Sequence, residues 1–186
     1  MKRVFDIVLA LIGLVAASPV ILVCMAAIRA TSPGPAIFRQ KRVGLHEKEF
    51  TCLKLRTMYR DTRDAPSHET GASAVTPVGR YFRRLKLDEL PQLWNVLIGE
   101  MSFVGPRPCL PSQTELIISR RALGLYKIRP GITGVSQVAG IDMSEPERLA
   151  AHDATYLQDM SLAADFRLIA ATVLGSGRGD RVNSAG

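Results

Sequence analysis

The sequence has few of the residues that build disulfide frameworks or metal centres. Three of its 186 residues are cysteine and three are histidine. Cys24, Cys52 and Cys109 lie far apart, are odd in number and form no Cys-x-x-Cys pair, so neither a disulfide framework nor a zinc site is predicted. The histidines are equally scattered and have no neighbour at metal-ligand spacing. This usage fits a reducing, cytosolic environment.

Acidic residues are in the minority, and repeats are absent. The chain has 24 Lys and Arg against 17 Asp and Glu, a formal net charge of +7. Such a balance favours an anionic partner, for example nucleotide phosphate, anionic lipid or nucleic acid. Neither an internal repeat nor a coiled-coil heptad is present. At this length we expect one domain with a substantial core.

Long apolar runs are also scarce, since only Ile7 to Ile28 forms an uncharged stretch long enough to span a bilayer. A cleaved signal peptide would explain the preceding Lys2 and Arg3, but the run is long for one and a basic, cysteine-poor chain follows. A straight spanning helix is the second interpretation. The positive-inside rule disfavours it, because basic residues flank both ends of the run. Those after it are Arg29, Arg39, Lys41 and Arg42.

The third interpretation, a re-entrant helix, satisfies the charge rule, and we favour it. Ser18 and Pro19 lie in the middle of the run, where proline removes a backbone hydrogen bond and can bend a helix. The Ser18 hydroxyl can satisfy part of the backbone freed there. We therefore predict a re-entrant membrane helix over 1–30 broken at Ser18-Pro19, a cytosolic domain over 31–175 and a flexible tail over 176–186.

Short extended segments follow the apolar run. Residues 37–58 are typical of a small β-hairpin with a turn at Gly44. Lys54 and Arg56 are two residues apart and would share one face of a strand. They could hold a diphosphate or simply be solvated. Residues 60–76 are poor in apolar side chains and predict a mobile loop.

Helical spacing dominates the rest of the chain, so we predict an α+β fold that is mostly helical. Arg80, Arg83 and Arg84 lie on a short helix over 78–87 and precede two carboxylates. These arginines could neutralise the carboxylates or attract an anionic ligand. Further helices are predicted over 114–125, 145–157 and 162–174, with a glycine-bounded loop over 127–134.

The adjacent acids Asp88 and Glu89 are the main candidates for chemistry. Asp88 is a good N-cap for a helix that runs to Gly99, and Pro91 is tolerated in a first turn. A helix start gathers unpaired N–H groups that lower an aspartate's pKa and attract phosphate. An anionic nucleophile and an anionic substrate could therefore meet there. The plain alternative is a cap followed by a first-turn acid.

A set of short motifs follows in order along the chain: Lys2-Arg3-x-x-Asp6, Ser18-Pro19, Phe38-x-Gln-x-Arg42-x-Gly44, Lys54-Leu-Arg-Thr-Met58, Leu87-Asp-Glu-Leu-Pro-Gln-Leu93, Gly105-Pro-Arg-Pro108 and Arg129-Pro-Gly-Ile-Thr-Gly134. In this order and spacing they resemble the bacterial sugar transferase family, whose monotopic phosphoglycosyl transferases begin glycoconjugate assembly on a polyprenyl phosphate. The resemblance covers nearly the whole chain and implies a re-entrant membrane helix bearing a catalytic domain.

The resemblance also implies a mechanism. Asp88 would attack the sugar-linked phosphorus of a UDP-sugar, release UMP and pass the phosphosugar to polyprenyl (undecaprenyl) phosphate. Glu89, with Asp88, would hold Mg²⁺. The basic residues expected to bind phosphate are Arg107 first, then Arg83, Lys54, Arg56 and Arg129.

The family likeness places the enzyme on the cytosolic face of the bacterial inner membrane. Its expected partners are a UDP-sugar, a polyprenyl phosphate and the lipid bilayer, but not nucleic acid, and a homodimer is left open. The sequence departs from the family pattern at Glu100, Cys109, Val135 and 139–141. Glu100 is a mild change, whereas the departures at Cys109, Val135 and 139–141 bear on which sugar is bound. We separately expect an N-acetylated amino sugar. A non-catalytic basic membrane adaptor and a UDP-sugar hydrolase are the alternatives.

Overall fold

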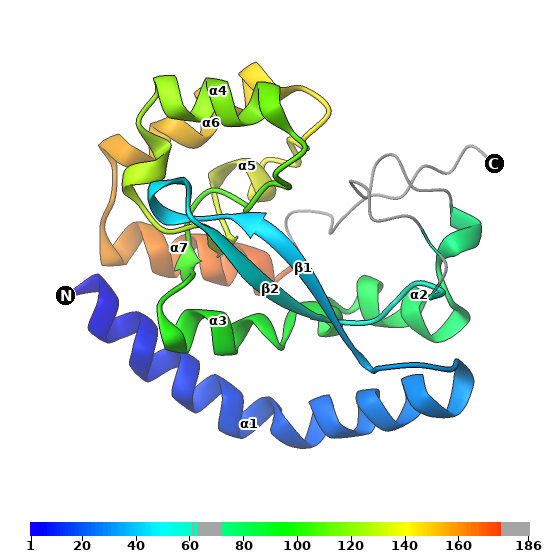
Figure 1. Ribbon diagram of the computed structural model, residues 1–186. Helices are drawn as coiled ribbons and strands as arrows, with labels where there is room; N and C mark the ends of the chain where they lie inside the picture. The colour runs from blue at the N-terminus through cyan, green and yellow to red at the C-terminus, as the bar shows by residue number, and fades with distance from the viewer. Residues whose placement is uncertain (61, 63–71, 176–186) are drawn as a thin grey trace.

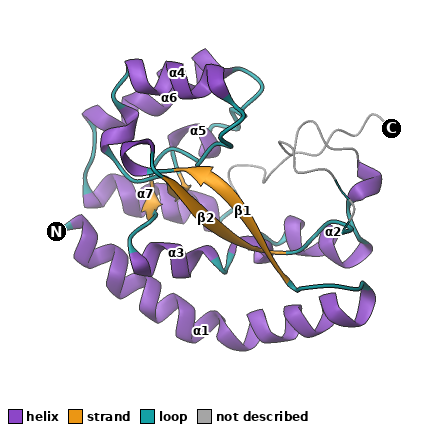
Figure 2. Ribbon diagram, viewed as in Figure 1, coloured by secondary structure: helices purple, strands orange, loops and turns teal. Residues whose placement is uncertain are grey.

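The structure is a computed structural model that describes residues 1–60, 62 and 72–175. It is mostly helical, as the sequence predicts, and contains two small sheets (Figures 1 and 2). The predicted tail over 176–186 and most of the predicted loop over 60–76 lie outside the described residues.

The apolar run forms α1, Lys2–Thr31, a helix long and apolar enough to cross a membrane by length and composition. The chain stays helical through Pro19, so the predicted break is not an interruption of the helix. Proline has no N–H to offer the carbonyl one turn earlier, and the Ser18 hydroxyl donates to that Val15 carbonyl at 2.8 Å. The helix is bowed, and both of its ends lie toward the rest of the domain (Figure 1).

The predicted hairpin is confirmed. Strand β1, Ile37–Val43, pairs antiparallel with β2, Glu49–Leu55, in a register that joins Ile37 to Leu55 and Val43 to Glu49. Gly44 and a short 3₁₀ turn, η1 (Leu45–Glu47), connect them. Phe50 and Cys52 of β2 pack with Ala10 of α1, so the hairpin shares a core with this long apolar helix.

A second sheet was not predicted. Strand β3, Ser102–Val104, runs parallel to β4, Gly131–Thr133, which falls in the segment predicted as a loop. Each strand has three residues, too few for alternation to distinguish a strand from a loop. The chains approach closely here: a Cβ on Gly131 would lie 2.2 Å from the Gly105 nitrogen. Glycine at both positions permits this contact.

The helices predicted after the hairpin are confirmed, with boundaries shifted by a few residues. They are α2 (Pro77–Arg84), α3 (Gln92–Ile98), α4 (Thr114–Ala122), α6 (Pro146–Gln158) and α7 (Leu162–Val173), together with a short helix, α5 (Val135–Val138), that was not predicted. α3 ends at Gly99 as expected, in the left-handed region with φ +95°. α3 packs along α1, whereas α4 and α6 form a separate layer on the far side of the hairpin (Figure 1).

Candidate active site

Asp88 and Glu89 lie in a 3₁₀ turn, η4 (Leu87–Glu89), one turn before α3. The prediction that Asp88 caps this helix is therefore wrong, because the N-cap position is taken by Pro91. Lys86, just before the turn, has a left-handed backbone with φ +56°, a rare conformation for a residue with a Cβ. The turn places Asp88 inside the domain, where it is 7% exposed.

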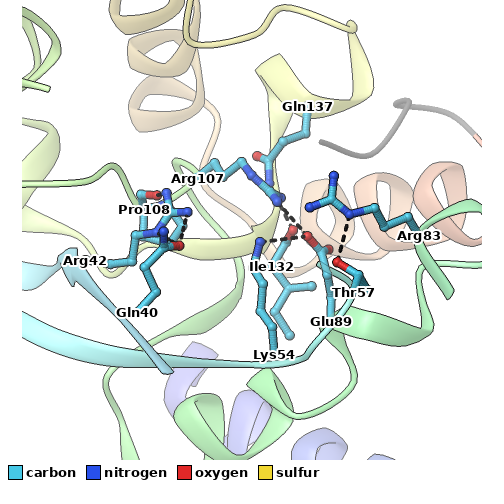
Figure 3. A network of polar contacts seen from close by, with 10 residues as sticks. All are labelled: Gln40, Arg42, Lys54, Thr57, Arg83, Glu89, Arg107, Pro108, Ile132 and Gln137. Atoms are coloured by element: carbon cyan, nitrogen blue, oxygen red, sulfur yellow. Dashed lines mark hydrogen bonds and ion pairs between the residues drawn. The ribbon is translucent and has the colours of Figure 1, made fainter. Parts of the chain in front are cut away.

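Glu89 lies between two cations from distant parts of the chain. Its Oε1 accepts a hydrogen bond from Arg107 Nη2 at 2.6 Å and lies 3.8 Å from Lys54 Nζ (Figure 3). Lys54 comes from β2 and Arg107 from the irregular segment 105–108 that follows β3. All three side chains are less than one-fifth exposed, so their charges interact more strongly than on the surface.

Arg83, near the end of α2, points toward Glu89 and the two cations that contact it (Figure 3). Its Nε donates to Thr57 Oγ1 at 2.9 Å, which fixes the guanidinium plane. Its Nη1 is buried and has no hydrogen-bond partner among the described residues. An unpaired buried donor is costly, so this nitrogen suits an oxygen of an anionic ligand.

Arg83 and Asp88 line a cavity of about 350 Å³ beside the hairpin. Asp88 is the one acidic side chain among the described residues that line it, and the basic ones are Arg39, Arg42, Lys54, Arg56, Arg60 and Arg83. Cavities of this size hold small ligands, and the excess of positive charge selects an anion. The arrangement sets one carboxylate among cations, next to a space that fits phosphate groups.

Cys52 is also close to the site, but it is not a candidate nucleophile. It is 1% exposed, and burial raises the pKa of its thiol despite the nearby Lys54 and Arg42. A protonated thiol is a poor nucleophile. Among the groups near the cavity, Asp88 is therefore the better nucleophile.

The structure does not bring Arg56 and Arg129 to Glu89. Arg56 lines the cavity, but its Nη1 donates to the Pro33 carbonyl at 2.6 Å and its Nη2 to the Ser32 carbonyl at 2.9 Å. Arg129 Nε donates to the Gly99 carbonyl at 2.8 Å, at the end of α3 away from Asp88. Both guanidinium groups hold backbone carbonyls rather than the predicted carboxylate cluster.

Comparison with known proteins identifies the group to which this fold and cluster belong. The family model for bacterial sugar transferases matches residues 1–178. The chain belongs to the bacterial sugar transferase family. The predicted assignment to this family of transferases is thus confirmed.

Individual relatives of this transferase carry different names. A Caulobacter vibrioides protein named UDP-glucose:undecaprenyl-phosphate glucose-1-phosphate transferase is 41% identical, over 92% of this chain and 68% of that protein. The uncharacterized sugar transferase EpsL of Bacillus subtilis is 38% identical, over 93% of this chain and 85% of its own length. A UDP-N-acetylgalactosamine-undecaprenyl-phosphate N-acetylgalactosaminephosphotransferase of Aeromonas hydrophila is 35% identical, and the match covers 42% of that protein.

Three polar residues of the transferase's site had no predicted role. Thr57 orients Arg83, as described above. Gln40 Oε1 accepts from Arg42 Nε at 2.9 Å, and Arg42 Nη1 donates to the Pro108 carbonyl at 2.9 Å (Figure 3). All three residues occur in the motifs that carry the family resemblance, but a motif does not reveal which atoms meet.

Few of the described side chains near the cavity could ligate a metal ion. Over residues 1–60, 62 and 72–175, no group of three or more His, Cys, Asp or Glu side chains could hold an ion. Mg²⁺ is commonly bound by one or two carboxylates, with water and substrate phosphates completing its shell. Asp88 and Glu89 fit that pattern, so the predicted Mg²⁺ site stays a prediction that requires a bound phosphate.

Proposed function

We propose that this transferase moves a phosphosugar from a UDP-sugar to polyprenyl phosphate through a covalent intermediate on Asp88. The observation that carries the proposal is the position of Asp88, the lone described carboxylate in a cavity lined by cations. That cavity favours the diphosphate of the donor, and the carboxylate lies where it can attack.

In the first step, a carboxylate oxygen of Asp88 forms a bond to the sugar-linked phosphorus. The bond from that phosphorus to the bridging oxygen breaks, and UMP leaves with the electron pair. In the second step, an oxygen of polyprenyl phosphate attacks the same phosphorus and releases the Asp88 carboxylate. The product is a polyprenyl diphosphate sugar, and the enzyme is regenerated.

The basic residues stabilise charge that moves during these steps. Arg83 would donate its buried, unpaired Nη1 to a phosphate oxygen. Arg107 and Lys54 hold Glu89 beside Asp88 and would share their donors with the diphosphate. The Arg83 donor is in place before reaction and need not reorganise, whereas Arg107 and Lys54 would release part of their contact with Glu89.

Asp88 and Glu89 would together hold Mg²⁺ against the donor phosphates. The ion would offset phosphate charge, so that the carboxylate of Asp88 can approach an anionic centre. Glu89 would then exchange part of its contact with Arg107 for the ion. Titration of the protein with Mg²⁺ in the presence and absence of UDP tests this role by calorimetry.

We also propose that α1 is re-entrant and that the catalytic domain faces the cytosol of a bacterial inner membrane. The first turns of α1 are bound to the domain: Lys2 Nζ lies 2.6 Å from Asp165 Oδ2, and Arg3 Nη1 donates to the Val96 carbonyl at 2.6 Å. Buried Asp6 accepts from Ser102 and from the Phe103 nitrogen. These contacts place the start of α1 against the domain.

The far end of α1 is bound to the same domain by Arg56, which holds the carbonyls of Ser32 and Pro33. A straight spanning helix would put its two ends on opposite sides of the bilayer and break one set of contacts. Cysteine labelling at the N-terminus and at residue 31 from the periplasmic side tests the topology. Labelling of neither position is expected, and labelling of the N-terminus alone would reject the hairpin.

The activity test uses the full chain in detergent with Mg²⁺, undecaprenyl phosphate and a panel of UDP-sugars that includes glucose and N-acetylated amino sugars. We expect UMP release with at least one sugar and its loss in Asp88→Asn. The exposed Asp159 offers a matched control, Asp159→Asn, that should leave activity unchanged. Absence of UMP with every sugar, from folded protein, would reject the proposal.

The same assay separates the alternatives. A UDP-sugar hydrolase would turn over repeatedly without undecaprenyl phosphate. A basic adaptor would bind anionic vesicles with an affinity that falls steeply with salt and does not depend on Asp88. The transferase requires the lipid acceptor for multiple turnovers.

A further inference from the structure

The most deeply buried ion pair among the described residues lies outside the cavity. Arg120 of α4 and Asp153 of α6 are 2% and 1% exposed, and Arg120 Nη2 lies 2.7 Å from Asp153 Oδ2. The other terminal nitrogen, Nη1, donates to the backbone carbonyl of Arg107 at 2.7 Å. One guanidinium thus joins α6 to the residue that holds Glu89.

Stability alone does not explain this pair. Removing two charges from water is costly, and apolar side chains of similar volume often stabilise a core as well or better. The Arg120 Nε is also buried without a hydrogen-bond partner among the described residues, so the pair is not fully satisfied. A charged group kept at such cost suggests that its geometry is needed.

The Pro106 and Cys109 carbonyls accept backbone hydrogen bonds from Gly131 and Val43 at 2.9 Å, but the two carbonyls between them have no backbone donor among the contacts described. Pro106 and Pro108, on either side of Arg107, have no N–H to donate. Two arginines instead hold successive carbonyls from outside: Arg120 binds that of Arg107, and Arg42 binds that of Pro108. Fixing the carbonyl of Arg107 fixes the origin of its side chain, which reaches Glu89 at 2.6 Å.

We propose that Arg120 is a positioning residue, which Asp153 orients so that Arg107 meets Glu89 and the donor phosphates. This inference rests on the proposed transfer reaction. A lysine at position 120 could keep the charge contact with Asp153, but a single ammonium cannot reproduce the planar fork that reaches two acceptors. Arg120→Lys therefore separates the ion pair from the bond to Arg107.

The neighbouring Arg121 supplies the matched control. It is on the same helix and forms a two-pronged pair with Glu47, but its side chain is 59% exposed and contacts neither Arg107 nor Glu89 in the contacts described. Arg120→Lys should lower kcat roughly tenfold to a hundredfold, as small misplacements of a catalytic group do, with KM for the UDP-sugar changed much less. Arg121→Lys should leave both constants near wild type.

A double-mutant cycle with Arg107→Ala tests the route of the effect. If Arg120 acts through Arg107, Arg120→Lys should have little further effect on kcat once the Arg107 side chain is gone. Multiplicative losses, or an unchanged kcat in Arg120→Lys, would overturn the inference while wild-type UMP release still upheld the proposed function. If Arg120→Lys fails to fold, the double variant Arg120→Gln with Asp153→Asn, which removes both charges, replaces it in the cycle with Arg107→Ala. Little further loss of kcat again supports the inference, and multiplicative losses overturn it.

Discussion

Two groups of basic side chains in this transferase carry the same charge but bind different partners. Arg83, Lys54 and Arg107 surround the Asp88–Glu89 turn, and they contact a carboxylate or a neutral hydroxyl. Arg56 and Arg129 donate to backbone carbonyls at the ends of α1 and α3, although Arg56 Nε, like Arg83 Nη1, is buried without a partner among the described residues. From this difference we expect the side chains that face the Asp88–Glu89 turn to bind the donor phosphates, and those that hold backbone carbonyls to contribute mainly to stability.

The largest effect is expected for the first group, from Arg83→Ala. The substitution removes the unpaired donor beside Asp88, and loss of one preorganised donor typically lowers the rate about 10²-fold to 10³-fold. Thermal unfolding in detergent should change little, because its bond to Thr57 is the one fold contact described for Arg83. A large fall in unfolding temperature with normal kcat would place Arg83 in the second group.

The converse pattern is expected for Arg56→Ala. It leaves the carbonyls of buried Ser32 and of Pro33 without their donor, so the free energy of unfolding should fall by about 2–3 kcal/mol. Below the unfolding transition, kcat should stay within a few-fold of wild type. If kcat fell a hundredfold in a fully folded sample, Arg56 would bind the substrate after all.

Arg129→Ala should have a smaller effect of the same kind. The substitution removes a cation and a hydrogen bond from the last carbonyls of α3, which is worth about 1 kcal/mol. Arg3 still holds the Val96 and Leu97 carbonyls at that helix end. Urea unfolding followed by circular dichroism measures the change, and a change in the KM for UDP-sugar larger than threefold would contradict it.

The smallest effect is expected at the surface pair of Glu47 and Arg121. The hydrogen bond from Arg121 lowers the pKa of the Glu47 carboxyl below its ordinary value of 4.5. A lowered folded-state pKa contributes stability that is present above the ordinary pKa and lost as pH falls through the folded value. Glu47→Gln should therefore lower the unfolding temperature slightly at pH 7, with the difference vanishing in acid and at high salt. A difference that grows as pH falls would show the wrong sign.

The main elements were predictable because their patterns are long or strongly punctuated. The uncharged run gave α1, alternation around Gly44 gave the hairpin, and Gly99 ended α3. Strand β4 was missed because three residues carry no recognisable period. Asp88 was mistaken for a cap because a 3₁₀ turn before a proline has the same residue types as a helix start.

The candidate site was predictable as a set of residues but not as a set of contacts. Asp88 and Glu89 are adjacent in sequence, the motifs contain Lys54 and Arg107, and Arg83 belongs to the arginines just before the two carboxylates. Whether an arginine donates to a backbone carbonyl depends on which distant segment lies beside it in the fold. Arg129, for example, donates to the carbonyl of Gly99, 30 residues away in the sequence. Only the folded chain shows that Arg120 and Asp153 lie behind Arg107.

The most direct test of the central claim is a search for the phosphosugar on Asp88. The full chain is incubated with Mg²⁺ and its UDP-sugar in the absence of polyprenyl phosphate, quenched, digested and analysed by mass spectrometry, with Asp88→Asn in parallel. We expect a stoichiometric burst of UMP and a phosphosugar adduct on the peptide containing Asp88, which disappears when polyprenyl phosphate is added. UMP formed only when the lipid acceptor is present, with no adduct at any time, would contradict a covalent role for Asp88.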